Sequence, residues 1–286
     1  MFLKLLVRHL LLLVLAILLG GLAGAALVRY APGFDSDASQ LDATRGSGSF
    51  DAVRAARAGE HQVISYFGTY LWNLAHGEFG DSRAFHRPVR DLLSERAGVT
   101  LEFVSLGLLA GCGFGLLAAM GAIYFTVLDG AFSLLSGILL SIPAAIAAIA
   151  ALVLDAPLWI CLAAVIFPRV FRYTRDLLAE AASAPHVIAA RARGAGPATV
   201  MLRHVLPSAM PQTMALLGIT VSTAMAADIP VEVLSGMPGI GQLAWQAAGA
   251  RDLPVLVVMT MLLGAVAITA NALADLAAHA WRTASA

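Results

Sequence analysis

The stretch "FVSLGLLAGCGFGLLAAMGAIYFTVL", Phe103–Leu128, decides the fold. It contains no ionised side chain, and a helix needs about 20 mostly apolar residues to cross the roughly 30 Å hydrocarbon core of a bilayer. Within it Gly107, Gly111 and Gly115 recur at every fourth position, on one helix face. Small residues in this pattern let a neighbouring backbone approach closely. The stretch therefore predicts a tightly packed membrane-spanning helix.

The rest of the chain repeats this type of segment. Further apolar runs without charge are Leu10–Val28, Gly130–Leu154, Val205–Ala227 and Leu253–Ala274. A shorter run, Ala156–Pro168, is expected to continue through Arg169, Arg172 and Arg175, because arginine stems can extend toward lipid headgroups. We therefore predict an all-α, polytopic membrane protein with six transmembrane helices. A re-entrant sixth segment is the alternative, and it would place the two termini on opposite sides.

Composition excludes several classes of function. The 286 residues are 59% hydrophobic and 13% charged, with zero net charge, and Lys4 is the single lysine. No basic face predicts nucleic-acid binding, and a phosphate-binding loop would need a lysine after glycine. The sequence has neither an H-E-x-x-H pair nor a G-x-S-x-G turn, and its histidines are scattered. We expect no enzyme, no metal site and no cofactor in this chain; Cys112 and Cys161 are read as packing residues.

Charge asymmetry predicts the orientation. The segment Arg169–Arg203 carries six arginines and two acids, whereas Arg29–Glu102 carries eight arginines and ten acids. Because cytoplasmic loops are enriched in basic residues, the first segment is expected inside, the second outside, and both termini in the cytoplasm. The division is then a first span (1–28), a periplasmic segment (29–102) and a core (103–286). The first span also resembles a secretory signal, but its length favours an uncleaved anchor.

The cytoplasmic stretch "SAPHVIAARARGAGPATVMLRHVLPSAMP", Ser183–Pro211, has the punctuation of two short helices. Pro185 and Pro197 suit first helical turns, and Gly194 with Gly196 permits a sharp break between them. A partly apolar helix pair outside the membrane is expected to bind another surface that shields its apolar side chains from water. The stretch by itself leaves two possibilities open, a protein partner or anionic lipid headgroups.

The spacing in this stretch resembles a motif of binding-protein-dependent ABC importer permeases. That motif has two alanines, a glycine four residues after the second, and Leu-Pro twelve residues after the glycine. The matching positions, which form the predicted coupling residues, are Ala189, Ala190, Gly194, Leu206 and Pro207. Ile188 stands where many relatives have glutamate, a departure typical of the peptide-importing branch.

Other stretches resemble the dipeptide and oligopeptide permeases of the same family. They are "RYAPG" (29–33), "YLWNLAHGEFGDS" (70–82), "RPVRDLLSERAGVTLEF" (87–103), "SIP" (141–143), "VEVLSGMPGIGQL" (231–243) and "ARDLPV" (250–255). The chain departs from the family at Phe34, in the missing basic tail, and in a connection between the second and third spans that is nearly reduced to Asp129.

The resemblance implies a type I ABC importer permease fold in the bacterial inner membrane. It implies a second permease subunit, two ABC ATPase subunits that bind ATP, a periplasmic solute-binding protein, and membrane lipid as partners. Segment 183–207 would couple to an ATPase. The loop residues Glu232, Pro238, Gly239 and Gly241 would form an outer gate or a binding-protein contact, unless the loop is ordered only for packing. Peptides are the expected substrate, although nickel chelates and some sugars use similar permeases; a non-transporting scaffold or sensor, or a peptide exporter, is the alternative.

Overall fold

The computed structural model describes residues 78–82 and 84–284, together with isolated positions nearer the N-terminus. Apart from those positions, the predicted first span, Leu10–Val28, and the segment 29–77 lie outside the described residues.

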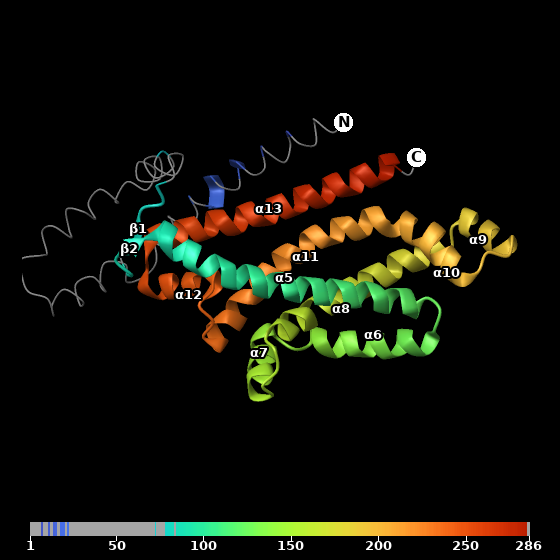
Figure 1. Ribbon diagram of the computed structural model, residues 1–286, viewed down its shortest axis with the longest axis horizontal. Coiled ribbons are helices and arrows are strands. Elements are labelled where there is room, and N and C mark those ends of the chain that lie inside the picture. Colours follow the sequence, from blue (N-terminus) through green and yellow to red (C-terminus); the bar gives the residue numbers. More distant parts are fainter. Residues whose placement is uncertain are drawn as a thin grey trace, which may run out of the picture. The chain divides into compact units, whose positions relative to one another are not determined.

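The described residues are almost entirely helical, as the sequence predicts (Figure 1). The elements are β1 (Asp81–Ser82), β2 (Arg87–Pro88), α5 (Val89–Ala122), α6 (Thr126–Leu140), α7 (Ala144–Val153), α8 (Trp159–Ala182), α9 (Pro185–Ala192), α10 (Pro197–Val200), the π-helical turn η2 (Met201–Val205), α11 (Leu206–Ser235), α12 (Ile240–Ala250) and α13 (Leu253–Ala284). The two strands form a short antiparallel ladder.

The chain divides into two compact units. The core unit consists of Met1–His9, Gly98–Gln242 and Val266–Ala286, and the flanking unit of Leu10–Ala97 and Leu243–Ala265. This division is one of packing, and the three-part division along the sequence remains a prediction.

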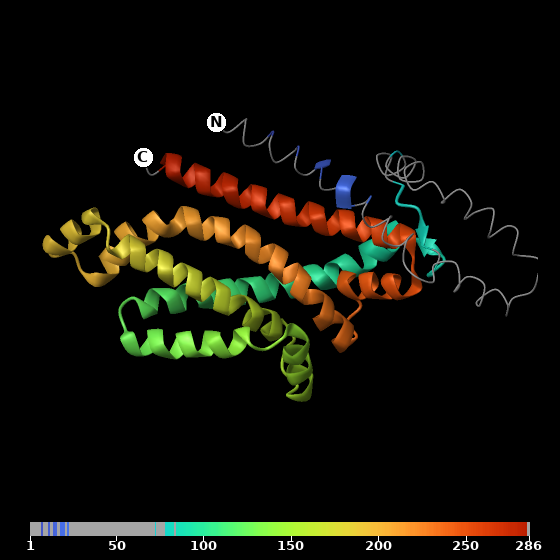
Figure 2. The same ribbon diagram turned by 180° about the vertical axis from the view of Figure 1, so that it is seen from behind.

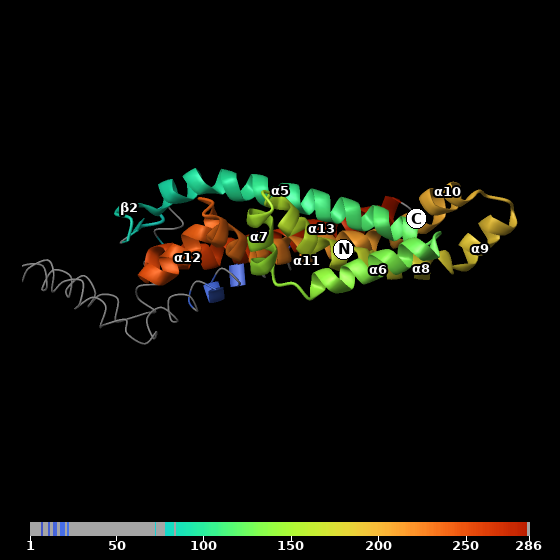
Figure 3. The same ribbon diagram turned by 90° about the horizontal axis from the view of Figure 1, so that it is seen from below.

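Three described helices are long and apolar enough to cross a membrane: Val89–Ala122, Pro197–Ser235, which joins α10, η2 and α11, and Leu253–Thr283. The pair α6 and α7 passes the same test as a unit but is bent by 100° (Figure 3). The prediction of one continuous span over Gly130–Leu154 is therefore wrong. The run forms two helices, which together are either a broken span or a re-entrant loop.

The break lies at the "SIP" stretch. The Ser141 N–H donates to the Ile138 carbonyl at 3.0 Å and the Ile142 N–H donates to the Leu139 carbonyl at 3.2 Å, and these two bonds end α6. Pro143 then precedes α7 with an extended backbone (ψ 144°), and its ring offers no N–H to continue the preceding helix. The local sequence thus explains why an uninterrupted apolar run does not form one straight helix.

The connection between α5 and α6 also differs from the prediction. The turn comprises residues 123–125, and Asp129 lies in the first turn of α6, where it pairs with Arg175 of α8 at 3.0 Å. Asp129 is therefore part of a helix–helix contact and not the connection itself.

The α8 helix continues through Pro168 and the arginines, as predicted. The arginine side chains, however, contact neighbouring helices. Arg172 Nε donates to Ser136 Oγ at 2.8 Å, and Arg169 Nη1 donates to Thr223 Oγ1 at 3.1 Å. These contacts hold two of the arginines against neighbouring helices of the core unit, and the expected extension toward lipid headgroups stays a prediction.

The glycine stripe of α5 packs on α8, as predicted. A Cβ at Gly107 would lie 2.8 Å from Leu162 Cβ, and one at Gly111 would lie 2.8 Å from Ile166 Cβ. At Gly115 the nearest atom would be Val170 Cγ1 at 2.9 Å. These distances leave no room for any residue larger than glycine. The three glycines therefore determine how closely α5 and α8 pack.

Helix α8 also lies along α11, and the two run side by side in opposite directions (Figure 2). From the middle of α8 to the end that leads into α9, buried apolar side chains form a core cluster; they include Phe167, Phe171, Leu178, Val187, Val200, Met201 and Val205. Since α9 and η2 contribute to this cluster, the predicted coupling segment is packed onto the core unit.

Candidate functional site: a docked helix pair and a buried glutamate bracket

The first short helix, α9, begins at Pro185 as predicted. Its Val187 and Ala190 side chains are buried, at 0% and 2% exposure, on the side that faces the core. Ile188 is 56% exposed, and Ala189 is exposed beside it. The two motif alanines therefore have different environments: Ala190 packs inward, and Ala189 belongs to an outer face with an uncovered isoleucine.

Gly194 ends α9 in the left-handed conformation, with φ +84°. Its N–H donates to the Arg191 carbonyl at 2.9 Å, and the Ala195 N–H donates to the Ala190 carbonyl at 3.2 Å. This pair of hydrogen bonds is a Schellman motif with glycine at C′. The Schellman motif explains why Ala190 and Gly194 are four positions apart in the sequence. The Ala195 N–H, directly after the glycine, bonds back to the Ala190 carbonyl.

The second half of the motif begins α11. Pro197 starts α10, and the chain then widens into the π turn η2 before Leu206 and Pro207. The Leu206 N–H bonds to the Met201 carbonyl, five residues back. Pro207 follows directly and supplies no N–H, so the altered hydrogen-bond register lies next to the residue that interrupts the α-helical ladder.

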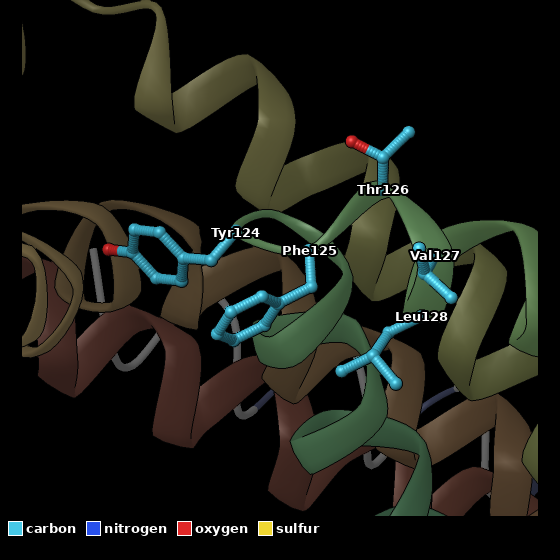
Figure 4. Close-up of a pocket in the computed structure, with 5 residues that line it drawn as sticks. All are labelled: Tyr124, Phe125, Thr126, Val127 and Leu128. Atoms are coloured by element: carbon cyan, nitrogen blue, oxygen red, sulfur yellow. The ribbon is translucent and has the colours of Figure 1, made fainter.

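Two side chains fasten the coupling segment to other helices of the core unit. Trp281 Nε1 of α13 donates to the Pro207 carbonyl at 3.1 Å. The Tyr124 hydroxyl, from the turn after α5, donates to the Pro197 carbonyl at 2.7 Å. Figure 4 shows the Tyr124 and Phe125 rings extending from this turn, which borders a hollow of about 450 Å³. The segment is thus joined by hydrogen bonds to α13 and to the turn after α5, and by apolar packing to α8.

The second cluster lies near the other end of α11. Glu232 is fully buried, at 0% exposure. Its Oε1 accepts from the Thr100 hydroxyl of α5, and its Oε2 accepts from the Gln242 N–H at 3.0 Å. Thr100 Oγ1 in turn accepts from the Ile240 N–H at 2.8 Å. We call this set, Thr100, Glu232, Ile240 and Gln242, the glutamate bracket; it joins α5 and α11 to the start of α12.

Three of the four predicted gate residues meet at this bracket. A Cβ at Gly239 would overlap the Glu232 carboxylate, and one at Gly241 would lie 2.9 Å from Ile229 Cα and 3.0 Å from Glu232 Oε2. Both glycines are therefore needed for the loop to approach the carboxylate. Pro238 is exposed and lies outside this contact.

Sequence reasoning missed two residues of this cluster. Thr100 carries no local signal, because its partner is 132 positions away. Asp228, one helical turn before Glu232, is 1% exposed, and its Oδ1 has no hydrogen-bond partner in the described part of the chain. An acid that interrupts an apolar stretch is a detectable signal, but the predicted boundary put Asp228 in an external loop.

The flanking unit contains a second buried carboxylate that unites two of the sequence stretches singled out above. Asp252, from "ARDLPV", is 1% exposed and accepts through Oδ2 from the Ser82 hydroxyl and from the Ala84 N–H at 3.0 Å. Ser82, from "GDS", also accepts from the Phe85 N–H at 3.0 Å. This contact holds together two stretches that are far apart in the sequence.

The coupling segment and the glutamate bracket are far apart within the core unit. Leu206 and Glu232 are separated by most of α11, roughly 39 Å at 1.5 Å per residue. That separation matches or exceeds the thickness of a bilayer core. A continuous helix therefore links the two motifs and is long enough to cross a bilayer core.

The described residues thus form a helical protein with membrane-length apolar helices, a docked helix pair at one end of α11 and a glycine-containing loop near the other. The chain matches the family "binding-protein-dependent transport system inner membrane component" over residues 111–282, and it belongs to that family. The resemblance identified in the sequence is thus confirmed. The expected location of the chain in a membrane is supported as well.

The relatives of this chain include named peptide permeases. A putative peptide permease protein of Brucella suis biovar 1 is 28% identical over 260 residues, 79% of this chain and 81% of the relative. The di/tripeptide transport system permease protein DppB of Pseudomonas aeruginosa is 31% identical over 105 residues, 37% of this chain and 31% of that protein. The oligopeptide transport system permease protein AppB of Bacillus subtilis is 28% identical over 105 residues, 37% of this chain and 33% of that protein.

Proposed function

We propose that this chain is the permease subunit of an ATP-driven importer that moves peptides across the bacterial cytoplasmic membrane. The proposal rests first on the named relatives, which include oligopeptide and di/tripeptide permeases. The observation that carries the mechanism is the docked helix pair α9–α10, whose outer face leaves Ile188 uncovered.

In this proposal the outer face of α9 contacts an ABC ATPase, which binds the ATP that this chain does not. Ala189 and Ile188 form the contact, and Gly194 sets the angle between α9 and α10. Because Val187 and Ala190 anchor α9 to the core, a displacement of α9 by the ATPase is transmitted to α8 and α11. Packed helices with two discrete arrangements then alternate between inward and outward openings.

The glutamate bracket is the proposed outer gate. Its hydrogen bonds join the loop before α12 to both α5 and α11, so a shift of α11 changes the position of the loop. A periplasmic solute-binding protein delivers the peptide at this side, and a second permease subunit completes the passage. The basic segment around α9 favours a cytoplasmic location for both termini.

Reconstitution tests this proposal directly. The chain is purified with its associated subunits and placed in proteoliposomes with ATP inside the ATPase-facing compartment, and uptake of labelled trialanine is measured with and without the binding protein. Uptake that needs both ATP and the binding protein is the expected result. Movement in the opposite direction would identify an exporter, and a complex that hydrolyses no ATP and moves no peptide would identify a scaffold.

A further inference from the structure

A cationic side chain lies near the middle of α8, on a face that the rest of the described subunit leaves open. Arg169 is exposed, ten positions after the start of α8 at Trp159 and thirteen before its end at Ala182. At about 1.5 Å per residue the nearer helix end is roughly 15 Å away. Arg169 therefore lies well inside α8 and not at either end of that helix.

One hydrogen bond fixes the position of this guanidinium. Arg169 Nη1 donates to Thr223 Oγ1 at 3.1 Å, while the same hydroxyl donates to the Ile219 carbonyl at 3.1 Å. Thr223 therefore donates its one hydroxyl proton within its own helix and uses its oxygen to orient Arg169 beside α11. Thr223 lies within the candidate span Pro197–Ser235, twelve residues before its end, so this contact is at membrane depth.

The neighbouring arginines of α8 are different. Arg175 pairs with Asp129 and Asp176, each at 3.0 Å, and Arg172 bonds Ser136 of α6. Among the ion pairs of the described residues none involves Arg169. A guanidinium has five N–H donors, and among the described residues Arg169 directs one of them at Thr223, so the other donors are open to a ligand.

Arg169 also begins a polar stripe on α8. Tyr173, Asp176 and Glu180 follow at intervals of four, three and four residues, and all are exposed. The opposite face of the helix, with Phe171 and Leu178 at 0% exposure, forms the core. Charged side chains at membrane depth are costly against lipid and ordinarily line water-filled cavities. This stripe therefore borders water, as the wall of a passage does.

We propose that Arg169 binds the terminal carboxylate of a peptide as it crosses the membrane, with Thr223 as the residue that positions the guanidinium. The planar guanidinium fork matches a carboxylate in two parallel hydrogen bonds. This inference rests on the proposed function and adds to it a substrate class, peptides with a free carboxyl end, and a residue of the passage wall.

A charge series at one position tests the inference. The assembled complex in proteoliposomes is given labelled trialanine, which has a free carboxylate, and uptake is compared for Arg169→Lys, Arg169→Gln and Arg169→Glu. Loss of one charge-assisted contact predicts about 10-fold less uptake for Arg169→Gln at low peptide concentration and about 3-fold less for Arg169→Lys. Arg169→Glu should be lowest, because it repels the carboxylate. Arg90→Gln, an exposed arginine at the start of α5, is the control and should match wild type.

Thr223→Val should raise the half-saturating peptide concentration by a larger factor than it lowers the maximal uptake rate, because it releases the guanidinium that binds the peptide. A purely structural role would instead lower the maximal rate along with the amount of assembled complex. The amount of assembled complex is measured for every variant, and Arg169→Lys gives the answer if the other substitutions impair assembly. Equal uptake by wild type and all three Arg169 variants, or equal loss in all three regardless of charge, would overturn the inference and leave the importer intact. A wild-type complex without peptide uptake would instead refute the proposed function.

Discussion

Single residues carry the two motifs, and each has a specific physical requirement. Gly194 must adopt φ +84°, in open space where an added Cβ would meet no atom within 4 Å. Gly239 has an ordinary backbone conformation but no room, because a Cβ there would overlap the Glu232 carboxylate. One glycine is needed for conformation and the other for close approach.

Gly194→Val should uncouple transport by straining the turn between α9 and α10. A left-handed backbone costs a side chain about 1–2 kcal/mol, and a β-branched residue tolerates it poorly. Asparagine adopts this conformation more readily, so Gly194→Asn should retain most of the peptide-dependent ATPase activity. The measurement is ATP hydrolysis by the complex with loaded binding protein. Equal activity of the valine and asparagine variants would contradict the role of the backbone angle.

Gly239→Ala should destabilise the loop at the glutamate bracket by about 1–3 kcal/mol, since the new methyl group must displace a buried, hydrogen-bonded carboxylate. Thermal unfolding in detergent measures this effect. Gly249→Ala is the matched control, because a Cβ on Gly249 of α12 meets no atom within 4 Å. It should raise helix stability slightly; a similar loss in both variants would show that the carboxylate is not the cause.

These residues differ in how far the sequence reveals them. The Gly194 turn is built from residues within five positions of one another, so its spacing can be recognised in the sequence. The bracket is not local, since Thr100 and Glu232 come from different helices. The resemblance singled out Glu232, Gly239 and Gly241 but gave no reason why these residues belong together. The structure supplies the reason, because the loop with both glycines packs against the buried Glu232 carboxylate.

At the scale of elements, the length of an apolar run predicts that a helix is present more accurately than it predicts where that helix begins and ends. Charged residues such as Arg90 and Glu95 lie within α5, which starts at Val89 although the apolar run begins at Phe103. Helix α11 likewise continues beyond Asp228 to Ser235. The ends are set by capping and hydrogen bonding, as with Gly236 at φ +71° after α11, and apolar run length does not report those features.

The two faces of α9 should respond differently to a charge. Ala189→Glu adds a carboxylate to the exposed face and should leave the amount of chain in the membrane unchanged while reducing ATP-dependent uptake at least 10-fold. Ala190→Glu buries the charge against the core and should lower the amount of folded chain, because an unpaired buried charge is strongly destabilising. Immunoblotting of membranes and uptake assays separate the two. Normal uptake by Ala189→Glu would remove the outer face of α9 from the coupling contact.

The α5–α8 contact should tolerate side chains at some glycines and not at others. Gly111→Leu inserts a side chain where Gly111 packs against the Ile166 side chain and the Ala163 carbonyl, and it should destabilise the core unit by at least about 1–3 kcal/mol. Gly113→Leu, two residues away where a Cβ meets no atom within 4 Å, should have little effect. Thermal unfolding of both variants in detergent checks this difference, and comparable losses would contradict the assigned packing.

At the scale of the whole molecule, we propose that motion of the docked helices is transmitted along α8 and α11. The sequence contains no phosphate-binding loop motif, and in the proposed function the energy comes from a partner ATPase that contacts the docked helices α9 and α10. The glutamate bracket lies at the other end of α11, where motion of that helix alters the loop before α12. In this account, peptide delivery and ATP hydrolysis occur on opposite sides of one set of packed helices.

The most direct test of this account is a cysteine crosslink from the outer face of α9. Ala189→Cys, in the complete complex, should form a crosslink to an ATPase subunit through a short bifunctional thiol reagent, and ATP should change its yield as α9 moves. Thr126→Cys, at the exposed first residue of α6, serves as the comparison at the same end of the core unit. Modification of the introduced α9 thiol from the periplasmic side, or the absence of any crosslink to an ATPase, would contradict the central claim.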